Sequence, residues 1–85
     1  MTIQLVFLAR LRERFGVSRE VFALAPGVTT VATLLDQLRE RGGAFAEELA
    51  PTRAFRVAVN QDVVSVGHPV RSGDEVAIFP PVTGG

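Results

Sequence analysis

The chain has 85 residues, 47% of them hydrophobic, and its nine basic side chains balance nine acidic ones. This length fits one domain with a modest core, and the high apolar content leaves some hydrophobic surface for a partner. Zero net charge argues against nucleic-acid binding, which needs a basic surface to neutralise phosphates, and gives no reason to expect an anionic membrane as partner. The absence of cysteine excludes disulfides, thiolate metal sites and iron–sulfur clusters.

The chain also has no lysine, because all nine basic residues are arginine. No side-chain amine can therefore form a Schiff base or accept an isopeptide bond, although an arginine bias of the genome explains this more simply than selection. Residues 1–3 carry no basic leader, and no apolar run approaches the roughly 20 residues that span a bilayer. We expect a soluble, cytoplasmic protein.

The N-terminal part of the chain predicts two strands joined by a short helical turn. Apolar side chains alternate within Ile3–Leu8, which is the pattern of a strand, and both faces of this strand become apolar toward its end. Leu11 and Phe15 lie four residues apart in a charged segment, which favours a helical turn that Gly16 ends. Residues 17–24 predict a second strand that pairs with the first.

The next segment carries the strongest helical pattern. Pro26-Gly27 predicts a turn, and the hydroxyl of Thr29 or Thr30 can cap the following helix by accepting a backbone N–H. One apolar stripe with helical spacing follows, made of Val31, Leu34, Leu35 and Leu38. We expect Gly42-Gly43 to end this helix and residues 44–50 to add a turn or two.

The last part of the chain predicts three short strands, at residues 55–59, 63–66 and 75–79. Turn-forming residues separate them, in the segments 60–62, 67–69 and 72–74. The order is therefore strand, strand, helix and three further strands, without an internal repeat. We predict a two-layer α+β domain in which one main helix lies across a single mixed sheet of about five strands.

No combination of side chains in the sequence predicts a catalytic site. His68 is the only histidine and lies between Gly67 and Pro69, so we interpret it as a turn residue rather than a base or a metal ligand. No serine belongs to an evident Ser/His/Asp arrangement. Asp74 and Glu75 are neighbours, and adjacent residues of a strand point to opposite faces, so they do not form a carboxylate pair.

The C-terminal end is the most informative part of the sequence. The last predicted strand runs directly into Pro80-Pro81-Val82-Thr83-Gly84-Gly85, which contains no charged side chain. Two prolines make a stiff, extended start, two β-branched residues continue it, and two glycines leave the tip without side chains. Such a tail reaches about 20 Å and can enter a narrow slot. A chance Gly-Gly end occurs in roughly one chain in two hundred, so the prolines, the missing charges and the adjoining strand carry the functional interpretation.

The carboxylate of Gly85 is the group on which chemistry can occur. A carboxylate is ionised at neutral pH and is a poor electrophile, but adenylation by a partner enzyme gives a mixed anhydride with a good leaving group. A sulfur nucleophile can then displace AMP and leave a thiocarboxylate, a soft nucleophile that can deliver sulfur to carbon. Glycine suits each step, because no β-carbon hinders attack on the carbonyl.

Five segments together carry a family resemblance. They are Phe79-Pro80-Pro81-Val82-Thr83-Gly84-Gly85, Gly73-Asp74-Glu75-Val76, Val59-Asn60-Gln61, His68-Pro69 and Phe7-Leu8-Ala9-Arg10-Leu11-Arg12-Glu13. Over nearly its whole length the chain resembles the sulfur carrier subunits of molybdopterin synthase, which are ubiquitin-like β-grasp proteins. The Pro-Pro-Val-Thr-Gly-Gly ending is quite specific, whereas a bare Gly-Gly end is shared with the thiamine sulfur carrier and with ubiquitin.

The resemblance implies a ubiquitin-like β-grasp domain over residues 1–79 and an extended tail over residues 80–85. A ubiquitin-activating-type adenylyltransferase would use ATP to adenylate Gly85, and a sulfurtransferase system would convert it to a C-terminal 1-thioglycine. The tail would then enter the large synthase subunit and deliver sulfur to cyclic pyranopterin monophosphate, in molybdenum cofactor biosynthesis. The chain would bind no cofactor or metal and would be no enzyme on its own, because the large subunit supplies the catalytic side chains.

The resemblance also implies a partner-binding surface. Leu8, Val63 and Phe79 match the family's apolar contact residues, and Arg12 matches a polar contact beside them. In the alternation of the first strand, Leu8 falls at a position that points outward, which agrees with this role. Core packing is the alternative for the three apolar residues, and for Phe79 the two interpretations are equally strong.

Three alternative functions stay open. The same sulfur chemistry could serve thiamine synthesis or tRNA thiolation, although Pro80-Pro81-Val82-Thr83 disfavours both. The chain could also be a ubiquitin-like modifier that is joined to lysines of target proteins through Gly85. Finally, it could be a plain interaction domain with an inert tail.

Overall fold

The structure, a computed structural model, describes residues 1–81. Its elements are β1 (Thr2–Phe7), α1 (Ala9–Phe15), β2 (Arg19–Ala23), α2 (Val31–Arg39), α3 (Gly43–Glu48), β3 (Arg56–Val59), β4 (Asp62–Val64) and β5 (Glu75–Phe79). The strands form one sheet in the order β2-β1-β5-β3-β4. Strand β5 pairs parallel with β1 and antiparallel with β3, and the pairs β1–β2 and β3–β4 are antiparallel.

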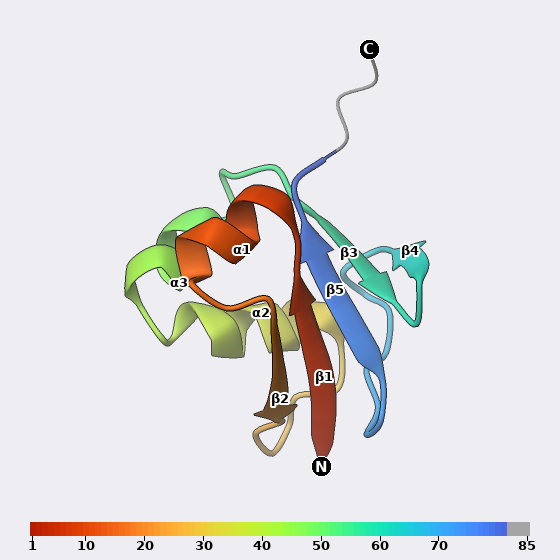
Figure 1. Cartoon of the computed structure of the whole chain (residues 1–85). Helices are drawn as coiled ribbons and strands as arrows, with labels where there is room; N and C mark the ends of the chain where they lie inside the picture. Colours follow the sequence, from red (N-terminus) through yellow and green to blue (C-terminus); the bar gives the residue numbers. More distant parts are fainter. Residues whose placement is uncertain (82–85) are drawn as a thin grey trace.

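The sheet and the helices form two layers, with α2 crossing the direction of the strands (Figure 1). The prediction of a single mixed sheet packed on one main helix is therefore confirmed, and the arrangement is the ubiquitin-like β-grasp fold. The short helical turn predicted after the first strand is α1. Within residues 1–81, no helix has the length and apolar character needed to cross a membrane.

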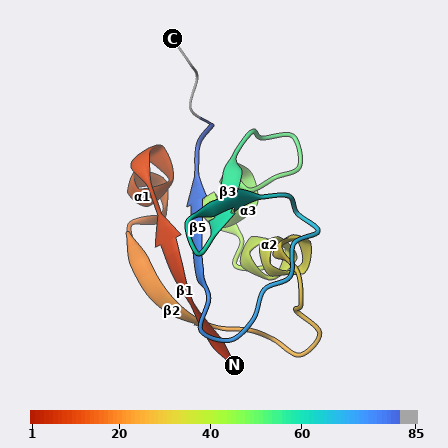
Figure 2. The same ribbon diagram turned by 90° about the vertical axis from the view of Figure 1, so that its right-hand side faces the viewer.

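Helix α2 begins at a capping box and buries its apolar stripe. Thr30 Oγ1 accepts a hydrogen bond from Thr33 N (3.2 Å), and Thr33 Oγ1 accepts one from Thr30 N (3.0 Å). Two backbone N–H groups at the start of the helix are thereby satisfied. The predicted stripe lies entirely in the core: Val31, Leu34, Leu35 and Leu38. The connection between β4 and β5 runs alongside the first turn (Figure 2), where Ala32 N donates to Val66 O.

The end of α2 differs from the prediction. The helix ends at Arg39, and its C-cap residue Glu40 keeps a right-handed conformation with φ −64°. Gly42 (φ 73°) and Gly43 (φ 52°) instead redirect the chain and begin α3, in a backbone region that glycine enters without steric cost. A glycine pair between two helices looks the same in sequence whether it closes the first or opens the second.

The core lies between the sheet and the helices. Strands β1 and β5 supply alternate residues to it, namely Ile3, Leu5, Phe7, Val76 and Ile78. Phe15 of α1 and Phe45 of α3 stack with their ring centroids 4.1 Å apart, and the ring of Phe7 meets Phe15 edge-on at 4.9 Å. These aromatic contacts hold α1 and α3 against the end of β1.

A polar bridge joins the β3–β4 turn to the start of β5. Asn60 and Gln61 form the turn with positive φ angles of 49° and 73°. Asn60 Nδ2 donates to Asp74 Oδ1 (3.0 Å), and Asn60 Oδ1 accepts from Glu75 N (3.0 Å). Asparagine tolerates this left-handed backbone and its amide reaches both partners. Asn60 therefore helps to hold the β3–β4 turn against the start of β5.

Candidate functional site

Strand β5 carries the chain to the end of the molecule where the predicted tail begins. It ends at Phe79, and the half-buried Pro80 and Pro81 follow. Helix α1 and the segment before β3 lie at this same end, whereas the N terminus lies at the opposite end (Figure 1). The remaining predicted tail residues lie outside the described residues: Val82, Thr83, Gly84 and Gly85.

The face of the sheet that is turned away from α2 is called the open face. Alternate residues of β1 and β5 enter the core, so the residues between them lie on the open face. In β3 the side chains of Val57 and Val59 enter the core, and Ala58 lies on the open face although it is only 7% exposed. Strand pairing arranges these residues in rows. In one row Val6 pairs with Ala77, Ala77 with Ala58, and Ala58 with Val63. This row crosses β1, β5, β3 and β4 and carries only apolar side chains.

A second row lies nearer to the tail. Arg56 of β3 pairs directly with Phe79 of β5. Leu8 follows the parallel pair Phe7–Ile78, and its N–H donates to Ile78 O (3.2 Å). Leu8, Phe79 and Arg56 are therefore neighbours at the ends of three adjacent strands, next to the point where the chain leaves the sheet.

The apolar members of the two rows form an apolar patch of Val6, Leu8, Ala58, Val63, Ala77 and Phe79. Leu8 is 43% exposed and Val63 is 64% exposed. Phe79 is half-buried and is not part of the core cluster. Leu8 and Val63 thus lie at the surface, whereas Phe79 is half-buried outside the core cluster. A contact of the three residues with a partner stays a prediction.

Leu8 owes its exposure to the turn between β1 and α1. It keeps an extended conformation (φ −119°, ψ 156°), and the next residue, Ala9, has a left-handed φ of 53°. A non-glycine residue in this region costs roughly 1–2 kcal/mol. The turn takes the backbone away into α1 at once and leaves the side chain of Leu8 next to that of Phe79.

Two arginines without an ion pair inside residues 1–81 flank the apolar patch. Arg12 lies on α1, which begins directly after Leu8, and Arg56 lies on β3 beside Phe79. Both are exposed. Ion pairs within the same part of the chain involve Arg10, Arg14, Arg19, Arg39, Arg41 and Arg53. The patch therefore has an apolar centre with positive charge on two sides.

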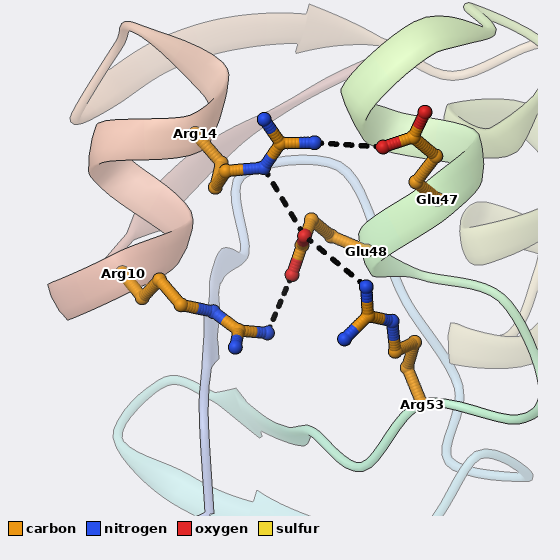
Figure 3. A network of polar contacts seen from close by, with 5 residues as sticks. All are labelled: Arg10, Arg14, Glu47, Glu48 and Arg53. Carbon is orange, nitrogen blue, oxygen red and sulfur yellow. Dashed lines mark hydrogen bonds and ion pairs between the residues drawn. The ribbon is translucent and has the colours of Figure 1, made fainter.

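The buried carboxylate of Glu48 joins the segments at the tail end of the molecule (Figure 3). Glu48 is only 4% exposed, and its oxygens lie 2.6 Å from Arg10 Nη2, 3.1 Å from Arg14 Nε and 3.8 Å from Arg53 Nη2. The more exposed Glu47 pairs with Arg14 Nη2 at 2.7 Å. These contacts tie α3 to α1 and to the segment before β3, so they fix the position of α1 beside the patch.

Ion pairing displaces the pKa values of two carboxyl groups. Burial alone would raise the pKa of Glu48, but a hydrogen bond from Arg14 and the charge of the other two arginines outweigh burial, and the pKa lies below its ordinary value. The two hydrogen bonds from Arg41 (2.8 and 2.9 Å) likewise lower the pKa of Glu20. Both groups are ionised at neutral pH, so neither is suited to act as a general acid.

The part of the chain that the structure describes holds no group of three His, Cys, Asp or Glu side chains that could bind a metal ion. His68 lies exposed in the turn predicted for it, and its backbone N–H donates to Ser65 O (3.1 Å). A hollow of about 320 Å³ on β1 and β2 is lined by Gln4, Arg19, Glu20 and Val21. Its charged groups are already ion-paired, with Glu75 and Arg41, so this hollow offers no free acid, base or nucleophile.

Reasoning from the sequence missed Arg56 and the small residues of the patch. Alternation within β3 places Val57 and Val59 on one face and Arg56 and Ala58 on the other, and this signal was present in the sequence. The neighbours of Arg56, however, come from β5. Because no local pattern specifies the register between strands distant in sequence, the contact with Phe79 required the structure.

Comparison with known proteins identifies the family. A profile of the ThiS family matches residues 5–85. The chain is 39% identical over 83 residues to the molybdopterin synthase sulfur carrier subunit of Escherichia coli (strain K12), covering 98% of this chain and 99% of that protein. It is 34% identical, with the same coverage, to the protein of the same name from Haemophilus influenzae. A solved structure from Pyrococcus furiosus, assigned as molybdopterin converting factor subunit 1, has a TM-score of 0.79 at 30% identity and covers 96% of this chain and 99% of its own. This chain therefore belongs to the ThiS family.

Proposed function

We propose that this chain is the sulfur carrier subunit of a molybdopterin synthase. The observation that carries the proposal is an identity of 34–39%, over nearly the whole chain, to proteins that bear this name. The family profile extends through Gly85 and so includes the residue on which the chemistry depends. The exposed side chains of Leu8 and Val63, together with the half-buried Phe79 directly before Pro80, also support the proposal.

In this proposal Gly85 is the reacting residue and becomes a 1-thioglycine. Its carboxylate oxygen attacks the α-phosphorus of ATP, bound to a ubiquitin-activating-type adenylyltransferase, and pyrophosphate leaves. A sulfurtransferase system then supplies sulfur at the oxidation level of sulfide, which attacks the carbonyl carbon and displaces AMP. Glycine favours both steps because its carbonyl has no β-carbon beside it.

The large synthase subunit is the proposed recipient of the tail. Residues 80–85 enter its active site, and the sulfur of Gly85 attacks cyclic pyranopterin monophosphate. The large subunit supplies the catalytic side chains, whereas this chain contributes only its terminal group and binds no cofactor of its own. The proposed compartment is the cytoplasm, and neither a nucleic acid nor a membrane takes part.

The apolar patch and Arg12 are the proposed docking surface. Leu8 and Phe79 lie nearest to Pro80, so docking of the patch sets the point from which the tail enters the partner. Removal of these side chains from water favours association. The rigid backbone of the two prolines then sets the direction in which the chain continues toward Gly85.

Reconstitution of sulfur transfer tests the proposal. The thiocarboxylated chain, mixed with the large subunit and cyclic pyranopterin monophosphate, should form molybdopterin. A variant that lacks Gly85, and another with one residue added after it, should keep the melting temperature of the unmodified chain yet form no product. Full activity of the extended variant would contradict the proposal.

Parallel experiments separate the alternative functions. Complementation of strains deficient in molybdopterin, thiamine or tRNA thiolation should rescue only the molybdopterin-deficient strain. A protein modifier would instead form higher-mass conjugates that depend on Gly85 and are visible on a denaturing gel.

A further inference from the structure

Arg56 is a charged residue on the open face, at the end of the sheet where the tail begins. It is not part of the docking surface proposed above. It begins β3, is exposed, and lies directly across from Phe79. Its strand neighbours Val57 and Val59 belong to the core, so alternation places Arg56 on the same face as Phe79. Within residues 1–81, its guanidinium group takes part in none of the ion pairs.

Most arginines of this chain are neutralised by a carboxylate, and Arg56 is an exception. Of the nine arginines, three lack an ion pair within the described part of the chain: Arg12, Arg56 and Arg71. Arg12 and Arg56 lie on opposite sides of the apolar patch, on α1 and β3. Arg71 lies in the turn before β5, where Gly73 N donates to Thr2 O (2.8 Å), and hence at the end of the molecule that is remote from the tail.

We propose that Arg56 binds a carboxylate group on the large synthase subunit when the open face docks; this inference rests on the proposed function. A partner that covers Phe79 also removes water from the adjacent guanidinium. An unpaired charge in such an interface is unfavourable, so the partner must supply an anion beside it. The planar guanidinium matches a carboxylate with two parallel hydrogen bonds.

The position of Arg56 also allows this contact to restrict the orientation of the partner. An apolar patch alone tolerates rotation of the partner, because hydrophobic contact has little directionality. Positive groups on both sides of Phe79 define two points at which the partner surface must present negative charge. Two such points fix the rotation of the partner about the direction of β5, and with it the direction in which the tail enters.

Charge reversal tests the contact. Arg56→Glu should weaken binding to the large subunit by roughly ten-fold or more, chiefly through faster dissociation, and Arg56→Gln should weaken it less. The assay contains no nucleotide and no pterin, and the difference should shrink as salt is raised. Arg71→Glu is the matched control and should bind like the unmodified chain. The melting temperatures of all three variants should agree with that of the unmodified chain.

Four results would overturn the contact. If Arg56→Glu binds normally while Phe79→Arg binds poorly, Arg56 does not contact the partner, and the proposed function stays intact. Equal losses for Arg56→Glu and Arg71→Glu would mean that net charge alone matters. A loss seen only when pterin is added would assign Arg56 to the phosphate of the substrate. Normal binding of both Arg56→Glu and Phe79→Arg would remove the docking surface itself and contradict the proposed function as well.

Discussion

At Phe79 the sheet ends and the tail begins, and the side chain is half-buried but is not part of the core cluster. Phe79→Arg should therefore leave the melting temperature nearly unchanged while it weakens binding to the large subunit by about 2 kcal/mol or more, roughly thirty-fold. Calorimetric titration of the folded variant measures this loss. Val21→Arg is the control, because Val21 is 69% exposed on the open face but lies outside the apolar patch. Unfolding of Phe79→Arg would instead assign the residue to the core.

At Asn60 the structure depends on both the side chain and the backbone. Asn60→Ala removes the two hydrogen bonds to the start of β5 and puts alanine, which tolerates the left-handed region less well than asparagine, at φ 49°, so the free energy of unfolding should fall by about 2–3 kcal/mol. Asn60→Gly loses the same hydrogen bonds but accepts the backbone angle, and should cost about 1 kcal/mol less. Denaturant titration compares the two variants, and equal losses would contradict the contribution of the backbone.

At the scale of elements, Glu48 makes the junction of α1 and α3 sensitive to acid. Its pKa is lower in the folded chain than its ordinary value, so the ionised carboxylate stabilises the fold above about pH 4.3, and this contribution disappears as pH falls further through the folded-state pKa. Glu48→Gln should lower the free energy of unfolding at neutral pH by about 1–3 kcal/mol and should flatten the acid side of the stability profile.

The neighbouring Glu47 provides the control for Glu48. It is 64% exposed and, within residues 1–81, pairs with Arg14 alone, so Glu47→Gln should change the free energy of unfolding by about 0–1 kcal/mol. Urea titrations of both variants across the acid range measure the difference. An acid profile of Glu48→Gln that matches the unmodified chain would contradict the role of the buried carboxylate.

Elements with a local pattern and the pairing of the first two strands could be predicted from the sequence, whereas the register between strands distant in sequence could not. The stripe of α2 and the last strand at residues 75–79 appear in the structure as expected. The end of α2 was placed too late, because Gly42 begins α3 and does not close α2. Alternation within the first strand correctly predicted the outward position of Leu8, which is 43% exposed. In contrast, the place of Arg56 beside Phe79 depends on the register between β3 and β5.

At the scale of the whole molecule, the core cluster and the residue proposed to react come from different parts of the chain. The core cluster extends from Ile3 to Ile78, so a chain that ends at Pro81 should unfold at the same temperature as the full chain. It should still compete with the full chain for the large subunit, because it keeps the apolar patch, but it should transfer no sulfur. Thermal unfolding and a competition assay measure the two properties. A large loss of stability would show that residues 82–85 belong to the fold.

The intact mass of the chain, measured after incubation with the adenylyltransferase, ATP and the sulfur source, tests the role of the terminal carbonyl most directly. We predict the exchange of one oxygen for one sulfur, with fragment ions that assign the sulfur to Gly85. A chain whose Gly85 keeps both oxygens and nevertheless supports molybdopterin formation would contradict the proposed function.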